Sequence, residues 1–236
     1  MREQLHKLCE QYGCRLETDV KLSQHTTFRI GGTADFWAEI TCIEGMQALL
    51  RFCREEGIPY FVLGKGSNVL ASDDGYHGVI LHLGNAFSEI SVSGTTRTCQ
   101  AGAGRGAAAR IAAEHGLTGM ETLSGIPGTI GGALYMNAGA YGGEMKDVVT
   151  SCEYLTAEGE LRTMELAEME LSYRHSILRK IMLSFSLLRW SFRRVTRRRS
   201  IPEWKSFLSR ERPSSRWSIR VPAVRSSVRQ AAMHPC

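Results

Sequence analysis

The chain has 236 residues, a net charge of +5 and 43% hydrophobic residues, enough for one large domain or two small ones. Its charged start and the lack of ~18 uninterrupted apolar residues argue against a secretion signal or a membrane helix, so we expect a cytoplasmic protein. Seven scattered cysteines form no CxxC pair and no zinc-spaced cluster, which predicts reduced thiols that fill the core and no metal site.

Charge and glycine are unevenly distributed along the chain. Residues 179–236 hold fifteen of the 29 basic residues but two of the 24 acidic ones, so this segment carries +13 and the preceding residues carry −8. All 24 glycines precede the segment, which contains eleven serines. A domain without glycine is unusual because average usage is about 7%. The segment at 179–236 therefore does not have the charge balance or the glycine content of the preceding globular part.

The first part of the chain alternates helical and strand patterns. Residues 3–16 and 43–57 have apolar side chains at helical spacing. Residues 58–83 contain short apolar runs between Gly-rich and Asp-rich turns, which predicts a strand, a short strand and a third strand. A further helix is expected from about Ala107 to His115.

Glycines are concentrated at three places, two of which indicate contact between backbone and ligand, whereas the third is typical of a strand-to-helix turn. The sequence GKGSN at 64–68 follows a predicted buried strand and offers N–H groups, a hydroxyl and an amide, as phosphate-binding loops do. The run SGIPGTIGGALYMNAGAYGGE at 124–144 interleaves glycine with residues that are normally buried. Glycines 102, 104 and 106 precede the third helix, but they lack the GxGxxG spacing of a dinucleotide fingerprint, and no Walker loop is present.

Four ordered segments carry a resemblance to a known family. They are TTFRIGGTADFWAEI (26–40), FVLGKGSNVLASDDGYHGVIL (61–81), the segment from AGAGRGAAARIAAEHGL to AYGGEM (101–145), and LSYRHSIL (171–178). This pattern resembles the UDP-N-acetylenolpyruvoylglucosamine reductases, also called UDP-N-acetylmuramate dehydrogenases. The resemblance implies an α+β fold with the two-lobed FAD-binding domain of the vanillyl-alcohol-oxidase (PCMH) type. It implies a first lobe over 1–75, a second over 76–178, and a C-terminal substrate domain that is missing here or replaced by the basic tail at 179–236.

The resemblance also implies a set of site residues. The loop at 64–68 is expected to hold the pyrophosphate of FAD, and the glycine-rich segments to line the flavin. The cofactor-binding residues are then Gly64, Lys65, Gly66, Ser67, Asn68, Gly125, Ile126, Pro127, Gly128, Thr129, Ile130, Gly131, Gly132, Ala133, Asn137, Gly139 and Gly142. Arg174 matches the arginine that stabilises the charge developing on the substrate carboxylate, a task suited to a planar and permanently charged guanidinium.

The reaction implied by the resemblance has two halves. NADPH reduces FAD, and the flavin then delivers hydride to the enolpyruvyl group of a nucleotide-sugar substrate during peptidoglycan synthesis. The family's proton-donating serine lies in a motif resembling Y-P-S-A-G-S-x-F-K-R-P, which is absent from this chain, as is the assisting glutamate near the C-terminus.

A frameshift near Leu178 is our hypothesis for the tail. Codons permitted for residues 214–232 can be chosen so that a neighbouring frame reads KQVEYPSAGSAFKRPAGC, which contains the missing motif. On this hypothesis the Arg-rich run RRVTRRRS at 193–200 needs no nucleic-acid partner, although basic runs can bind one. We expect no nucleic-acid, membrane or obligate protein partner. The alternative function is a non-catalytic flavin-binding fragment with a basic tail.

Overall fold

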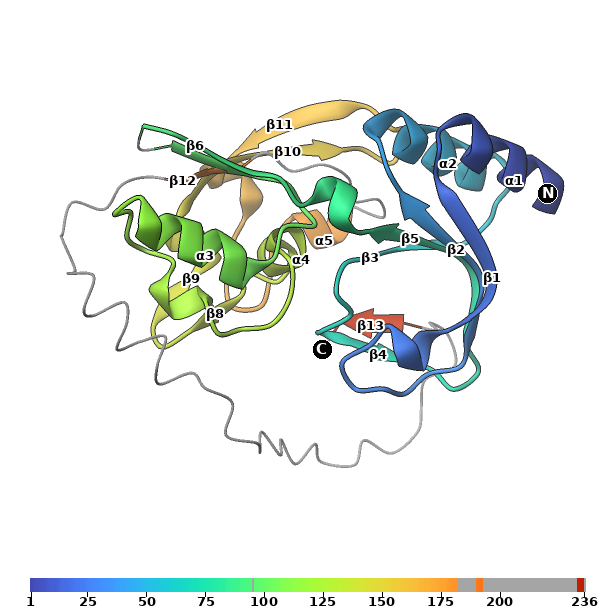
Figure 1. Ribbon diagram of the computed structural model, residues 1–236, viewed down its shortest axis with the longest axis horizontal. Coiled ribbons are helices and arrows are strands. Elements are labelled where there is room, and N and C mark those ends of the chain that lie inside the picture. The colour runs from blue at the N-terminus through green and yellow to red at the C-terminus, as the bar shows by residue number, and fades with distance from the viewer. Residues whose placement is uncertain (95, 182–189, 193–232, 236) are drawn as a thin grey trace.

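The computed structural model describes residues 1–94, 96–181, 190–192 and 233–235, and these form an α+β fold (Figure 1). The tail segments 193–200 and 214–232 considered above lie outside the described residues. The helices are α1 (Arg2–Gln11), α2 (Ile43–Glu55), α3 (Arg105–Glu114), α4 (Ile130–Tyr135) and α5 (Leu178–Ile181). The strands are β1 (Arg15–Lys21), β2 (Thr33–Ile40), β3 (Tyr60–Leu63), β4 (Val69–Ala71), β5 (Tyr76–Leu83), β6 (Ile90–Ser93), β7 (Thr96–Cys99), β8 (Gly139–Ala140), β9 (Gly143–Glu144), β10 (Val149–Leu155), β11 (Leu161–Glu165), β12 (Trp190–Phe192) and β13 (Met233–Pro235).

The N-terminal sheet has the strand order β1-β2-β5-β3, and the three strands predicted over 58–83 are confirmed as β3, β4 and β5. Strands β1 and β2 are antiparallel, whereas β5 runs parallel to both β2 and β3. The central strand β5 buries Val79, Ile80 and Leu81 completely, as expected for a strand covered on both faces. Because β5 begins at residue 76, the sheet continues past residue 75, where we placed the division between the lobes; that division stays a prediction.

The two faces of this sheet pack into different clusters. Side chains alternate along a strand, so Phe36 and Ala38 of β2 join the large core that includes α1 and α2, while Trp37 joins a smaller cluster with Leu63 and Ile80. Figure 1 shows α1 and α2 together beside this sheet. The sheet is therefore held between a helical layer and a second apolar layer.

The first helix is shorter than its apolar spacing predicts. The expected helix over residues 3–16 ends at Gln11, and Arg15 already begins β1. Gly13 has a φ of +65°, a left-handed conformation that glycine adopts readily and that ends a helix. The prediction was wrong at its C-terminal end because the apolar pattern of the strand continues that of the helix.

The second half of the structure packs around α3 and a three-stranded sheet. In α3 three alanines, Ala108, Ala109 and Ala112, are fully buried in the large core. Strand β10 pairs antiparallel with β11 and with β12, whereas β4, which packs with the N-terminal sheet, pairs antiparallel with β13. The hairpin β6–β7 and the short ribbon β8–β9 complete this part of the chain.

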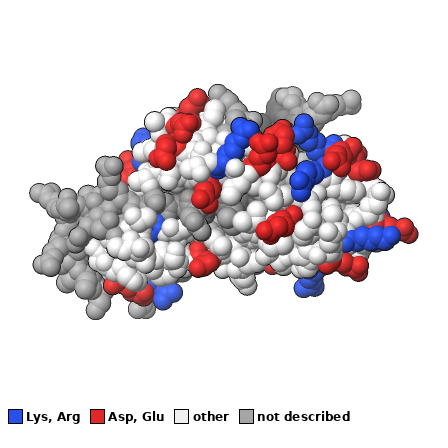
Figure 2. Space-filling model, turned by 90° about the horizontal axis from the view of Figure 1, so that it is seen from above, with Lys and Arg blue, Asp and Glu red and all other residues white. Residues whose placement is uncertain are grey.

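The surface of the described residues carries mixed charge. On the face seen in Figure 2, Lys and Arg are interspersed with Asp and Glu. Among the described helices, none has the length and apolar character needed to cross a membrane. The six described cysteines are free thiols, and five of them are buried, as expected for residues that fill the core.

Candidate functional site

A cavity of about 560 Å³ lies between the end of β3 and the segment that leads into α4. This volume is within the range of small-molecule and cofactor sites. Thirteen of the eighteen predicted site residues line it: Gly64, Lys65, Gly66, Ser67, Asn68, Ile126, Pro127, Gly128, Thr129, Gly131, Gly132, Ala133 and Arg174. The structure thus brings together residues that are more than a hundred positions apart in the sequence.

The loop at 64–68 is shaped by one glycine. Gly66 has a φ of +59°, and a Cβ added there would collide with the carbonyl oxygen of His25. The carbonyl of Gly66 accepts a hydrogen bond of 3.0 Å from the N–H of Thr27. A larger residue therefore has neither the conformation nor the space, and the loop that follows β3 is fixed against the segment before β2.

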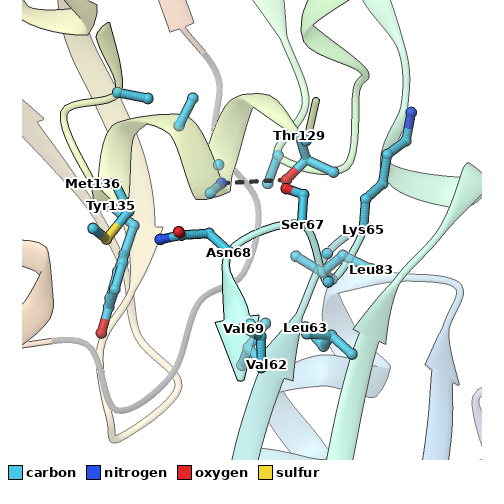
Figure 3. A pocket seen from close by; sticks show the side chains of 18 of the residues that line it. Val62, Leu63, Lys65, Ser67, Asn68, Val69, Leu83, Thr129, Tyr135 and Met136 are labelled. Atoms are coloured by element: carbon cyan, nitrogen blue, oxygen red, sulfur yellow. Dashed lines mark hydrogen bonds between the residues drawn. The ribbon is translucent and has the colours of Figure 1, made fainter. Parts of the chain in front are cut away.

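The two walls of the cavity meet at Gly64 and Thr129. A Cβ added to Gly64 would lie 2.7 Å from Oγ1 of Thr129, closer than ordinary van der Waals contact. Thr129 is the N-cap of α4, and its Oγ1 accepts a hydrogen bond of 3.2 Å from the N–H of Gly132. Figure 3 shows Ser67 and Thr129 close together, with Asn68 extending toward the wall that carries Tyr135.

Helix α4 forms within the glycine-rich run because its N-terminus packs tightly on the preceding segment. The N–H groups of Ile130 and Gly131 donate to the carbonyls of Ala103 and Ala101 at 2.8 and 2.9 Å. A Cβ on Gly131 would lie 3.0 Å from Cβ of Ala101, so glycine permits this contact. Ile130 points into the core with no exposed surface, and neither it nor Gly125 is part of the cavity lining.

Three other predicted site residues lie outside the main cavity. Gly139 and Gly142 line a separate hollow beside the β8–β9 ribbon. Asn137 is buried, and its Nδ2 donates to Oε2 of Glu144 and to the carbonyl of Ser172, both at 2.9 Å. Its Oδ1 accepts a 3.0 Å bond from the N–H of Lys146. The Asn137 amide therefore joins three segments of the chain.

Arg174 lies in a turn that this network supports. Ser172 and His175 form a β-bridge, and Arg174 between them has a φ of +52°. Its side chain is exposed, lines the cavity and lies with its guanidinium carbon 5.6 Å from the ring centre of Tyr173. The carbonyl that Asn137 holds belongs to Ser172, so the amide fixes the base of the turn that presents Arg174.

Sequence reasoning missed several residues of the cavity. Arg105, the first residue of α3, lines the cavity although only 3% of it is exposed. Tyr135 also lines it, and the guanidinium carbon of Arg179 lies 5.9 Å from its ring centre. An arginine at a helix start is normally solvated, so the sequence held no signal for Arg105. Tyr135 had a signal, since an aromatic residue stands within the glycine-rich run.

Apart from Arg179, the remaining lining is mostly apolar and gives the cavity two chemically different regions. Val62, Leu63, Val69 and Leu83 come from the N-terminal sheet and the strand beside it, and Met136 faces them from the end of α4 (Figure 3). Hydroxyls, backbone groups and cations lie at the loop that follows β3. An elongated ligand with a flat apolar part and an anionic part matches this division.

A likeness to flavoproteins agrees with this geometry. Residues 34–165 match the family model described as the FAD binding domain, and the chain therefore belongs to that family. A crystal structure of p-cresol methylhydroxylase is similar with a TM-score of 0.59 at 15% identity, covering 82% of this chain and 43% of that one. This similarity confirms the expected PCMH-type fold.

The relatives found by sequence similarity indicate a narrower group of flavoproteins. The chain is 44% identical over 172 residues to the UDP-N-acetylenolpyruvoylglucosamine reductase of Agathobacter rectalis, covering 68% of this chain and 54% of the relative. A crystal structure of UDP-N-acetylenolpyruvylglucosamine reductase from Thermus caldophilus is 29% identical with a TM-score of 0.67, covering 84% of this chain and 68% of that one. The expected resemblance is confirmed, and the chain spans about half the length of the curated relatives it matches.

Proposed function

We propose that this chain is the FAD-binding part of a reductase that uses NADPH to convert UDP-N-acetylglucosamine enolpyruvate into UDP-N-acetylmuramate, a step of peptidoglycan synthesis. The observation that carries the proposal is the convergence of the predicted loops on one cavity, in a chain similar to reductases of this name. On this proposal the substrate is a nucleotide sugar and the activity is that of an oxidoreductase acting on a CH–CH bond.

The cavity fits FAD in both of its regions. Cβ atoms added to Gly64 and Gly128 would lie 2.7 Å from Oγ1 of Thr129 and 2.9 Å from Oγ of Ser67, so glycine at both positions lets the two walls of the cavity approach closely. Backbone N–H groups of the 64–68 loop and the Ser67 hydroxyl would hold phosphate oxygens, and the apolar walls would hold the ring system. When bound there, FAD would supply the hydride carrier between NADPH and the enolpyruvyl group.

Arg174 is the residue of this chain that we propose for catalysis. Its guanidinium is exposed at the rim of the cavity, where a substrate carboxylate can reach it. A guanidinium binds a carboxylate with two parallel hydrogen bonds and stabilises the negative charge that develops when hydride is added at the neighbouring carbon. The serine motif for protonation is absent from the sequence, so the chain's own residues account for binding and charge stabilisation.

The test is an assay of the purified full chain after incubation with FAD. Retained flavin absorbance after gel filtration supports the cofactor site, and NADPH oxidation that depends on the enolpyruvyl substrate supports the reductase. The Arg174→Met variant is expected to keep its flavin while losing substrate-dependent oxidation. Flavin release from the unmodified chain would contradict the cofactor site.

The absent serine motif favours a second candidate, a non-catalytic flavin-binding fragment. Such a fragment would retain FAD and show no NADPH oxidation attributable to the substrate. The same assay therefore separates the two candidates, because they differ in turnover and agree in flavin binding.

A further inference from the structure

Arg105 is a buried cation with unused hydrogen-bonding capacity. It is 97% buried at the wall of the cavity, and its Nη2 donates to the carbonyl oxygen of Pro127. Its Nε and Nη1 are buried and have no hydrogen-bond partner in the described part of the structure. Buried polar groups almost always have partners, and a guanidinium offers five N–H donors. A buried cation at a cavity wall with two unpartnered nitrogens indicates a ligand that accepts hydrogen bonds.

The electrostatic environment specifies the charge of that ligand. No carboxylate forms an ion pair with Arg105 among the residues the structure describes. Burial, and then the positive charge of Arg174, lowers the pKa of Arg105 to about 10. The guanidinium still carries its charge at neutral pH, so the fold holds a desolvated cation that an anion would neutralise.

The neighbours of Arg105 indicate where the anion lies. The Ser67 hydroxyl donates to the same carbonyl of Pro127 as Arg105 does, at 3.1 Å, so both donors stand at one point of the wall. An added Cβ on Gly104, the N-cap of α3, would lie 3.0 Å from Nζ of Lys65. The ten-residue helix α3 thus starts between two cations, and its N-terminus also favours negative charge.

We infer that Arg105 is a cofactor-binding residue that neutralises the diphosphate of FAD, donating from its guanidinium group to the phosphate oxygens. This inference rests on the proposed function and adds a cation from α3 to the loop at 64–68. The shared chemistry is an oxyanion, which the diphosphate or carboxylate of the nucleotide-sugar substrate could also supply. The common carbonyl with Ser67 favours the cofactor, because Ser67 belongs to the proposed phosphate loop.

The test compares Arg105→Met with Arg110→Met in the full chain. Both substitutions remove one positive charge from α3, but Arg110 is exposed and pairs with Glu114 at 3.6 Å. Dissociation constants are measured by flavin fluorescence for FAD and for riboflavin, which has no phosphate. We expect Arg105→Met to weaken FAD about 10- to 100-fold, as for hydrogen bonds to a charged group, with riboflavin unchanged. Arg110→Met should change neither affinity by more than about threefold.

A second readout separates a ligand role from a structural one. Removing an unpaired buried charge relieves its desolvation, so the cofactor-free Arg105→Met protein should unfold at the same or a higher temperature, while the rise in melting temperature caused by FAD becomes smaller. A lower melting temperature without FAD together with unchanged FAD affinity would overturn the inference. Arg105→Lys, which keeps the charge, serves as the second variant and should bind FAD more tightly than Arg105→Met.

The remaining outcomes identify other sources of the effect. Equal loss of FAD and riboflavin affinity would show that Arg105 shapes the wall. The affinity for UDP-N-acetylglucosamine is measured in the same proteins, and a loss of this affinity alone would place the anion on the substrate. Either result overturns the inference. If the unmodified chain binds neither flavin, the proposed function itself fails. Failure of the inference alone leaves FAD binding to the unmodified chain intact, so the two failures are distinguishable.

Discussion

The contact between Gly64 and Thr129 can be tested with a double-mutant cycle. A Cβ at Gly64 would lie 2.7 Å from Oγ1 and 3.1 Å from Cγ2 of Thr129. Gly64→Ala therefore forces the two walls apart and should destabilise the fold by about 1–3 kcal/mol, as overpacking does. Thr129→Ala removes the cap of α4 and should destabilise it by about 1 kcal/mol.

The double variant tests whether residues 64 and 129 are in direct contact. Thr129→Ala deletes both atoms that the new methyl group would strike, so Gly64→Ala/Thr129→Ala should be less destabilised than the sum of the single changes, with a coupling of about 1 kcal/mol or more. The assay is urea unfolding of the four proteins followed by circular dichroism, with FAD affinity measured in parallel. Additive effects would show that the walls are not in contact as described.

Gly106→Ala is the matched control for this cycle. A Cβ there would meet nothing closer than the carbonyl oxygen of Ser124 at 3.6 Å. Because Gly106 lies inside α3, alanine should stabilise the helix by about 0.5–1 kcal/mol. Destabilisation by this variant would mean that alanine is harmful near the cavity regardless of contacts.

Two further predictions concern buried polar groups and thiols. Asn137→Ala should destabilise the protein by about 2–3 kcal/mol, because partners such as Glu144 and the Ser172 carbonyl lose their hydrogen bonds. Urea unfolding measures this loss, and a change below about 0.5 kcal/mol would contradict the hydrogen bonds described for Asn137. Burial, and then the neighbouring Cys9, raises the pKa of Cys53 to about 12, so iodoacetamide should label the half-buried Cys42 well before Cys53 in peptide mass spectra; equal labelling would mean that the core opens readily.

The parts of the site that sequence could predict are those determined by local backbone requirements. The loop at 64–68 needs a glycine at position 66 because the φ angle of this residue is +59°. A local requirement of this kind is visible in the sequence as a glycine. The apolar face of α2 was likewise visible, since Met46, Leu49 and Cys53 repeat at helical spacing and are buried. Local conformation and periodicity are properties that a single sequence displays.

The parts that could not be predicted depend on distant segments. The sequence around Arg105 is typical of an exposed helix start. The residue is nevertheless buried, with its guanidinium donating to the carbonyl of Pro127 in the loop at 126–129. Asn137 stays a predicted flavin-binding residue, but the hydrogen bonds from its amide to Glu144 and to the carbonyl of Ser172 could not be predicted from the sequence. These outcomes depend on tertiary contacts, which no pattern of neighbouring residues records.

The position of β5 has a consequence for how the chain is made. It lies between β2 and β3 in the sheet although it follows both in the sequence. During synthesis from the N-terminus, β2 and β3 therefore exist before the strand that joins them, and their facing edges stay open to other chains. Parallel pairing between strands far apart in the sequence is slow. A nascent chain is therefore most prone to misassembly before Leu83 has been synthesised.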